Sequence, residues 1–238
     1  MAVIDNKKES KMEENTKPVI KNIFWDVDGV LANLNFAYFN FLKNHPNYKD
    51  KYGNIEWNDL PKVLPIVPKY GALELKTHPE TGKEMDYDFC HSPEFFNNRP
   101  LYPGVIETLK ELNEMGYKQF TMSATFNIET KRKLLNDLFK DVLDFLVIEV
   151  VEHGKFMHDT AKEDMLKYCF NKYGLKAEET VLVDDRIYNQ HAIINVGGHP
   201  VRYRCEFTTD LPDDMKWIPE VHSLEEFKNW LKTETTFN

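Results

Sequence analysis

Residues 19–30 read VIKNIFWDVDGV, an apolar stretch that ends in two aspartates and a glycine. The β-branched and aromatic part, residues 19–25, is typical of a buried strand. The strand ends abruptly at two carboxylates, Asp26 and Asp28, which repel each other unless a cation joins them. Oxygen ligands of this kind suit Mg²⁺, and Gly29 permits a sharp turn with backbone N–H groups close to an anion. The alternative is an ordinary turn, in which Asp and Gly are common.

Strand and helix patterns alternate along the second half of the chain. Strands are expected at 117–123, 145–151, 180–183 and 200–203, and helices at 103–116, 128–143, 162–173, 190–195 and 224–231. This alternation indicates an α/β fold, in which helices cover both faces of a parallel sheet. Ligands bind such sheets at the carboxyl ends of the strands.

Residues 34–100 break the alternation. They begin with an aromatic run and contain four prolines between Pro61 and Pro79. We predict a partly helical module inserted after the first strand, with the core formed by residues 19–33 and 101–238. Residues 1–18 are polar and without periodicity, and we expect a disordered tail.

Composition narrows the possible partners. The 238 residues carry a formal net charge of -9, which disfavours a general nucleic-acid binder because such proteins neutralise phosphates. No apolar run approaches the roughly 20 residues of a membrane-spanning helix. Three cysteines without a CxxC pair suit a reducing cytoplasm. We therefore expect a cytoplasmic protein that binds a small molecule and neither a nucleic-acid polymer nor a membrane.

Four further residues could complete a site with Asp26 and Asp28. Asp184 and Asp185 follow the apolar stretch 181–183, where the alternative is a helix N-cap. Ser123 ends a predicted strand, and by itself it would be a cap or turn residue. Lys162 begins a predicted helix, where a lone lysine is usually solvated, and Lys155 is its rival.

The order strand–DxDG, strand–Ser, helix–Lys, strand–DD resembles the haloacid dehalogenase-like (HAD) hydrolase superfamily, from about Ile23 to Tyr203. The resemblance implies a doubly wound, Rossmann-like parallel sheet, with residues 34–100 as a small helical cap between the first and second motifs. It also implies a Mg²⁺-dependent phosphomonoesterase, because dehalogenases of this superfamily lack the second aspartate, Asp28. Residues 184–186 read Asp-Asp-Arg where Gly-Asp is more frequent, which leaves open whether Asp184 or Asp185 is the main metal ligand.

The resemblance also implies the role of each residue. Asp26 would be the nucleophile that forms an aspartyl-phosphate, and Asp28 would protonate the leaving oxygen and then deprotonate the attacking water. Ser123 and Lys162 would bind the transferring phosphoryl oxygens. Mg²⁺ would be held by Asp26, the backbone carbonyl of Asp28, Asp184 and Asp185. Contacts to the phosphate ester would come from Gly29, Ser123, Ala124 and Lys155.

The substrate is the least determined feature. Residues 92–108, SPEFFNNRPLYPGVIET, together with DVDGVLAN and VDD, resemble the 5'(3')-deoxyribonucleotidase branch, which makes (deoxy)nucleoside monophosphates candidate substrates. Base stacking on aromatic side chains is worth roughly 1–3 kcal/mol per base. The aromatic residues of the insertion that could stack a base, or alternatively form its own core, are Phe36, Tyr38, Phe39 and Trp57. Two further functions remain open: a phosphotransferase such as a mutase, and a catalytically silent interaction module, which the intact acidic set disfavours.

Overall fold

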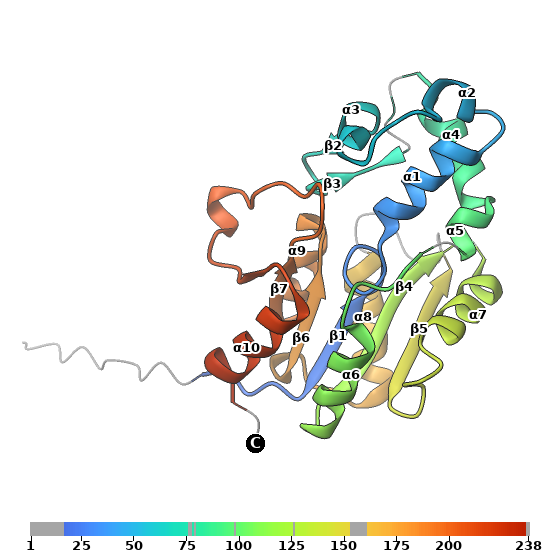
Figure 1. The fold of residues 1–238 in the computed structure, drawn as a ribbon. Coiled ribbons are helices and arrows are strands. Elements are labelled where there is room, and N and C mark those ends of the chain that lie inside the picture. The colour runs from blue at the N-terminus through green and yellow to red at the C-terminus, as the bar shows by residue number, and fades with distance from the viewer. Residues whose placement is uncertain are drawn as a thin grey trace, which may run out of the picture.

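The centre of the protein is a parallel sheet with the order β5-β4-β1-β6-β7-β8 (Figure 1). The computed structural model describes residues 17–75, 78, 80–97, 99–125, 127–152 and 161–236. Most of the predicted tail, residues 1–16, lies outside the described residues, but the carbonyl of Pro18 accepts a hydrogen bond from the backbone N–H of Thr236. The strands of the sheet are β1 (Asn22–Asp26), β4 (Lys118–Thr125), β5 (Leu146–Glu152), β6 (Thr180–Asp184), β7 (His199–Tyr203) and β8 (Glu220–Val221).

Strand register brings the predicted motifs to one edge of the sheet. β1 lies between β4 and β6, with Asp26 opposite Met122 and Trp25 opposite Val183. Because all six strands run in the same direction, the residues that follow β1, β4 and β6 meet at the carboxyl edge. The predicted α/β fold with a parallel sheet is confirmed.

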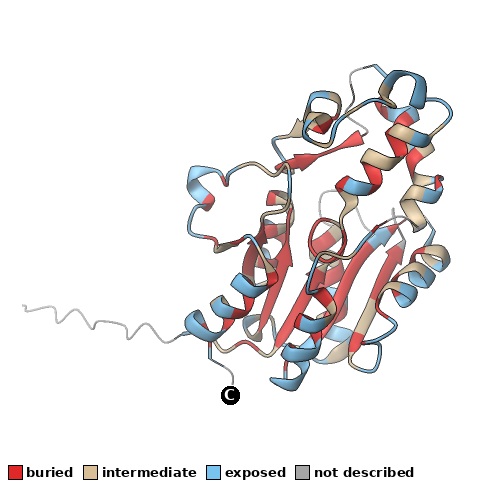
Figure 2. Cartoon of the chain, in the orientation of Figure 1, coloured by how far each residue is buried: buried red, intermediate tan, exposed pale blue. Residues whose placement is uncertain are grey.

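Alternating side chains of β1 attach helices to both faces of the sheet. Ile23 and Trp25 belong to a buried cluster with residues of α6, α7 and α10. Phe24 points the other way and packs with residues of α8 and α9, as expected from the two-residue period of a strand. These helices are α6 (Val105–Glu114), α7 (Ile128–Leu138), α8 (Ala161–Tyr173), α9 (Ile187–Asn195) and α10 (Leu224–Glu234). Figure 2 shows the strands buried and the outer helix faces exposed.

Several boundaries differ from the sequence prediction. The first strand begins at Asn22, since Val19 forms only an isolated bridge with Thr236. α7 ends at Leu138 and not near residue 143, yet Phe139 and Val142 in the turns beyond it are still fully buried. β8 has only two residues, too short for a periodic pattern.

The inserted segment forms a separate packing unit over the carboxyl edge of the sheet (Figure 1). It contains α1 (Leu34–Asn44), α2 (Lys49–Tyr52), α3 (Leu60–Val63), α4 (Gly82–Cys90), α5 (Pro93–Asn97) and the antiparallel pair β2 (Ile66–Val67) and β3 (Ala72–Leu73). Its buried apolar residues, including Phe41, Leu60 and Phe89, form a cluster distinct from those of the sheet. The helical character was predicted, whereas the β2–β3 pair was not.

Two short connections join this unit to the sheet, and they lie side by side. Ala32 pairs with Leu101, and the N–H of Asn33 donates to the carbonyl of Pro100 at 2.9 Å. A third contact comes from the β2–β3 turn, where the Tyr70 carbonyl accepts from the N–H of Ile187 at 3.0 Å. The insertion is therefore held against the sheet at both its ends and at its hairpin.

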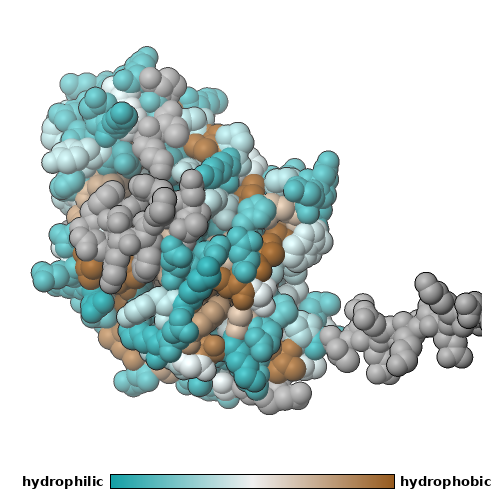
Figure 3. Space-filling view, turned by 180° about the vertical axis from the view of Figure 1, so that it is seen from behind, coloured by the Kyte–Doolittle hydropathy of each residue, from teal (hydrophilic) through white to brown (hydrophobic). Residues whose placement is uncertain are grey.

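Within the described part of the chain, no helix combines the length and the apolar character needed to cross a bilayer. From behind, hydrophilic residues predominate and hydrophobic ones occupy small separate areas (Figure 3).

Candidate active site

Three aspartates meet where β1 and β6 end. Asp26 is the last residue of β1, Asp184 is the last residue of β6, and Asp185 follows it. One carboxylate oxygen from each of them lies within 4.8 Å of the others. The side chains of Asp184 and Asp185 are buried, so their charges are poorly screened by water. The structure thus brings together both predicted acidic motifs.

Lys162 lies among these carboxylates, in the first turn of α8. Its Nζ donates to Asp26 Oδ1 at 2.5 Å, and it is 3.1 Å from Asp184 Oδ2. Burial by itself would lower the pKa of Lys162, but the two carboxylates outweigh it and raise that pKa. The residue is therefore a fixed cation beside the proposed nucleophile. Its rival Lys155 lies outside the described residues.

The single positive charge of Lys162 does not neutralise three carboxylates. Burial, opposed by Lys162 and reinforced by Asp184, raises the pKa of Asp26 to about 7. Burial and the neighbouring Asp184 raise the pKa of Asp185 well above its ordinary value. In addition, Asp185 Oδ1 is buried and has no hydrogen-bond partner among the residues described. A divalent cation bound by these oxygens would stabilise the ionised carboxylates, so the donor set fits Mg²⁺.

Gly29 is required at its position by the approach of Asp185. Its φ is +90°, and a Cβ placed there would lie 2.6 Å from Asp185 Oδ2. Any side chain at this position would therefore both strain the backbone and push the carboxylate away. The glycine of the DxDG motif keeps the turn after β1 close to the acidic cluster.

Asp184 is oriented by the first residues that follow it. Asn189 Nδ2 donates to both of its oxygens, at 2.9 and 3.0 Å, and the backbone N–H of Arg186 donates to Oδ1 at 3.0 Å. Asp185 receives no comparable backbone bond among the described contacts. This difference supports Asp185 as the carboxylate with more capacity for a metal, while Asp184 is shared with Lys162.

Asp28 is not one of the three clustered carboxylates, and it binds two cations instead, Arg99 and Lys131. Arg99 Nη1 donates to its Oδ1, and Lys131 Nζ donates to its Oδ2 at 3.0 Å. Burial would raise the pKa of Asp28, but Arg99 and Lys131 outweigh it and hold that pKa well below its usual range. The side chain of Asp28 is thus placed for proton transfer or binding, and not in the carboxylate cluster.

A sequence signal existed for Lys131 but not for Arg99. Lys131 precedes Leu135 by four residues, so the two share the buried face of α7. A lysine on the apolar face of a helix indicates a buried ion pair. Arg99 lies in an irregular connection after α5, where no periodicity marks a side chain as buried.

Ser123 was expected to end its strand, but it lies inside β4. β4 continues to Thr125, and Ser123 pairs with Val150 on β5, one residue beyond the level of Asp26. The Ser123 side chain is buried, whereas Ala124 is exposed. Both positions remain at the carboxyl edge, on the strand adjacent to β1.

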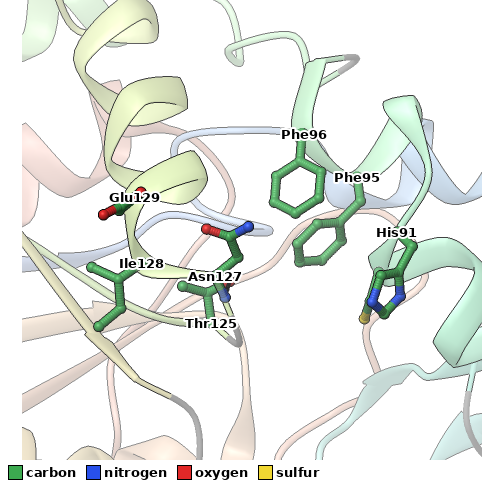
Figure 4. Close-up of a pocket in the computed structure, with 8 residues that line it drawn as sticks. His91, Phe95, Phe96, Thr125, Asn127, Ile128 and Glu129 are labelled. Carbon is green, nitrogen blue, oxygen red and sulfur yellow. Dashed lines mark hydrogen bonds between the residues drawn. The ribbon is translucent and has the colours of Figure 1, made fainter.

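A cavity of about 450 Å³ opens beside this edge, between α5 and the start of α7. Phe95 and Phe96 extend into it from one side, opposite Asn127 at the start of α7 (Figure 4). The lining residues are Cys90, His91, Phe95, Phe96, Thr125, Asn127, Ile128 and Glu129. A cavity of this size accommodates a small organic molecule.

Comparison with known proteins gives one consistent family. The family model described as haloacid dehalogenase-like hydrolase matches residues 20–197. The pyrophosphatase PpaX of Halalkalibacterium halodurans is 29% identical over 185 residues, which cover 74% of this chain and 78% of that protein. The glyceraldehyde 3-phosphate phosphatase of Methanocaldococcus jannaschii is 30% identical over 132 residues, or 55% of this chain and 56% of that one.

Solved structures agree at the level of the fold. A HAD-superfamily hydrolase of subfamily IA, variant 1, from Geobacter sulfurreducens superposes with a TM-score of 0.60 at 15% identity, covering 91% of this chain and 99% of that chain. The predicted doubly wound, Rossmann-like architecture is confirmed. The prediction of a phosphatase from this superfamily is confirmed at the level of enzyme class, by the family match and the phosphatase names of the relatives. The chain belongs to the haloacid dehalogenase-like hydrolase family.

Proposed function

We propose that the protein is a Mg²⁺-dependent phosphomonoesterase that forms an aspartyl-phosphate on Asp26 and acts on a small soluble phosphate ester. One observation carries this proposal: the oxygens of Asp26, Asp184 and Asp185 lie within 4.8 Å of one another around the buried Lys162. Such a cluster is unfavourable in an inert protein, because buried like charges destabilise the fold. It is useful where a carboxylate must approach a phosphate.

Asp26 is the nucleophile in this proposal. Lys162 binds Asp26 Oδ1, which orients the carboxylate and leaves its second oxygen for attack on phosphorus. Mg²⁺, when held by Asp26, Asp184 and Asp185, would offset the repulsion between this carboxylate and the phosphate. Ser123 and Lys162 would bind the phosphoryl oxygens, and Gly29 and Ala124 would supply backbone contacts.

Asp28 would carry the proton. With Arg99 and Lys131 as partners, its carboxylate is ionised in the arrangement seen here, which suits it to accept a proton from the water that hydrolyses the aspartyl-phosphate. The same group would donate that proton to the leaving oxygen in the next turnover. Substrate binding near Arg99 and Lys131 would reduce their hold on Asp28 and so favour the protonated form.

The insertion would act as the cap that selects the leaving group. We propose residues 34–100 as this cap and the cavity at Phe95 and Phe96 as the space for the organic part of the substrate. The aromatic residues that could stack a base, or alternatively form the core of the insertion, pack largely within the insertion. The ring centre of Trp57 lies 5.5 Å from that of Phe39 and 6.4 Å from that of Phe36, and Tyr38 packs against Phe89. Nucleoside monophosphates stay within the proposed class, but they would have to use the cavity aromatics instead.

Phosphate release from a panel of esters, with Mg²⁺ and with EDTA, tests the proposal. The panel contains deoxynucleoside and ribonucleoside monophosphates, sugar phosphates, phosphorylated acids and an aryl phosphate. We expect Mg²⁺-dependent release that is abolished by Asp26→Asn and unaffected by Asp141→Asn, which removes an exposed carboxylate. Release that survives Asp26→Asn would contradict the proposal.

Two other outcomes separate the alternatives. A mutase would transfer the phosphoryl group from Asp26 to a sugar hydroxyl, so phosphate release would be slow while isomerised sugar phosphate appears. A silent interaction module would neither release phosphate nor become phosphorylated.

We also place the protein in the cytoplasm, which is consistent with the absence of disulfides between its three cysteines, all within the described chain.

A further inference from the structure

Arg99 is a buried cation with most of its hydrogen-bonding capacity unused. Its side chain has 0% exposure and donates from Nη1 to Asp28. Its Nε and Nη2 are buried and have no acceptor among the residues that the structure describes. These two atoms form one edge of the guanidinium plane, the edge that binds a carboxylate or phosphate with two parallel hydrogen bonds. Burying such donors without an acceptor is costly.

The charges around Arg99 do not balance. Arg99 and Lys131 both bind the same carboxylate, that of Asp28. Lys131 is 1% exposed, and burial together with the neighbouring Arg99 lowers its pKa to about 8. Two buried cations therefore share one anion, which creates a local positive field in an otherwise acidic protein. A second anion bound beside Arg99 and Lys131 would offset this excess positive charge.

The cations adjoin the cavity. The Phe95 ring lines that cavity, and the Arg99 guanidinium lies over this ring at 4.3 Å from its centre. Lys131 Nζ is 5.9 Å from the same ring, and it extends from α7, whose first residues form the opposite wall. An anionic group bound in the cavity beside the Phe95 ring would thus approach Arg99 and Lys131, which both bind Asp28.

We propose that Arg99, assisted by Lys131, forms a second anion-binding site for the leaving group. The substrate is then a small phosphate ester that carries another anionic group, either a carboxylate or a second phosphate. Neutral alcohols of similar size, and nucleosides, would be poorer leaving groups at this site. The inference rests on the proposed phosphatase function and narrows its substrate class.

Matched esters test this site directly. For spacers of two to four carbons, we would compare an ω-phosphorylated carboxylic acid, the corresponding diol bisphosphate and the corresponding neutral hydroxyalkyl phosphate. For at least one ester that carries a second anionic group, the wild-type enzyme is expected to show a kcat/KM about 10- to 100-fold above that for the neutral counterpart. This is the usual range for a charge-assisted hydrogen bond. Whether the acid or the bisphosphate gives this preference identifies the anion.

Variants locate the preference. Arg99→Lys keeps a cation for Asp28 but loses the two-donor edge, so it should lose most of the preference while still hydrolysing the neutral ester. Arg99→Gln should lose the preference as well, but it also removes the cation beside Asp28, so Arg99→Lys is the variant that isolates the two-donor edge. Arg132→Gln is the control, because it removes an exposed cation from the next position of α7. It should retain the wild-type ratio.

Binding provides an independent readout. Calorimetry in the Asp26→Asn background would measure the affinities for the phosphorylated acid and for its neutral counterpart. Adding Arg99→Lys should weaken the affinity for the acid and leave the affinity for the neutral ester unchanged. A wild-type ratio near one, or a ratio unchanged by Arg99→Lys, would overturn the second anion site and leave Arg99 as a support for Asp28. Failure of the proposed function is distinguishable, because then no ester in the series would be hydrolysed.

Discussion

Replacing Asp26 with Asn is expected to stabilise the metal-free protein at neutral pH, although it removes the proposed nucleophile. Burial raises the pKa of this carboxyl from 3.8 to about 7, with Lys162 opposing and Asp184 adding to the rise. The folded state therefore binds the proton more tightly than the unfolded chain does. Between these two pKa values, the contribution of Asp26 to stability falls as the pH rises. Asparagine does not titrate and lacks this penalty.

The size of the effect follows from the shift. The rise of the Asp26 pKa from 3.8 to about 7 corresponds to about 4 kcal/mol, of which about 3 kcal/mol develops between pH 5 and pH 8. The Asp26 side chain is 15% exposed, so screening by water reduces this only modestly. For a chain of this size, the midpoint temperature changes by about 2–4 °C per kcal/mol. The advantage of Asp26→Asn should therefore grow by about 5–10 °C between pH 5 and pH 8.

Thermal unfolding followed by circular dichroism, in EDTA at pH 5, 6, 7 and 8, measures this difference. The pKa of about 7 already includes the opposing attraction of Lys162, so the loss of this ion pair in the variant is contained in the expected slope. Asp141→Asn, at an exposed position, should run parallel to wild type. A midpoint difference between Asp26→Asn and wild type that stays constant over this range would refute the reasoning.

Three other substitutions test separate parts of the site. Gly29→Ala should reduce apparent Mg²⁺ affinity by roughly tenfold or more in a Mg²⁺ titration of activity, because its Cβ would lie 2.6 Å from Asp185 Oδ2; unchanged affinity would contradict the close approach. Asn189→Ala should lower the apparent Mg²⁺ affinity about tenfold with little change in midpoint temperature, since it removes only hydrogen bonds that orient Asp184. A large drop in midpoint temperature would instead show that Asn189 has a structural role. Asp28→Asn should lower kcat by about 10²- to 10⁴-fold in steady-state assays and also lower the midpoint temperature, because two buried cations lose their partner; wild-type kcat would exclude proton transfer by this residue.

The acidic part of the site could be predicted from sequence because strand geometry determines it. Apolar strands that end in carboxylates place those carboxylates at one edge, and Asp26, Asp184 and Asp185 meet there as expected. The sequence left Lys162 and Lys155 open as alternatives, and the structure places Lys162 at this edge, because α8 begins there and its first turn reaches Asp26 and Asp184. In each case a regular element fixes where the side chain points.

The position of Arg99 beside Asp28 could not be predicted, because an irregular segment determines it. Arg99 lies in a connection without periodicity, and its burial depends on how the insertion packs against the sheet. The β2–β3 pair has two residues per strand, fewer than a repeating pattern needs. The division of roles between Asp184 and Asp185 also needed the structure, since it depends on bonds from Asn189 that residue type does not specify.

Trapping the covalent intermediate tests the role of Asp26 most directly. The enzyme would be mixed with Mg²⁺ and a hydrolysed ester, quenched during turnover and treated with borohydride, which reduces an acyl phosphate on aspartate to homoserine. Peptide mass spectrometry should find homoserine at position 26, only when Mg²⁺ and ester are both present, and not at Asp28, Asp184 or Asp185. Sustained phosphate release without modification of Asp26, or with modification of another carboxylate, would contradict the proposed mechanism.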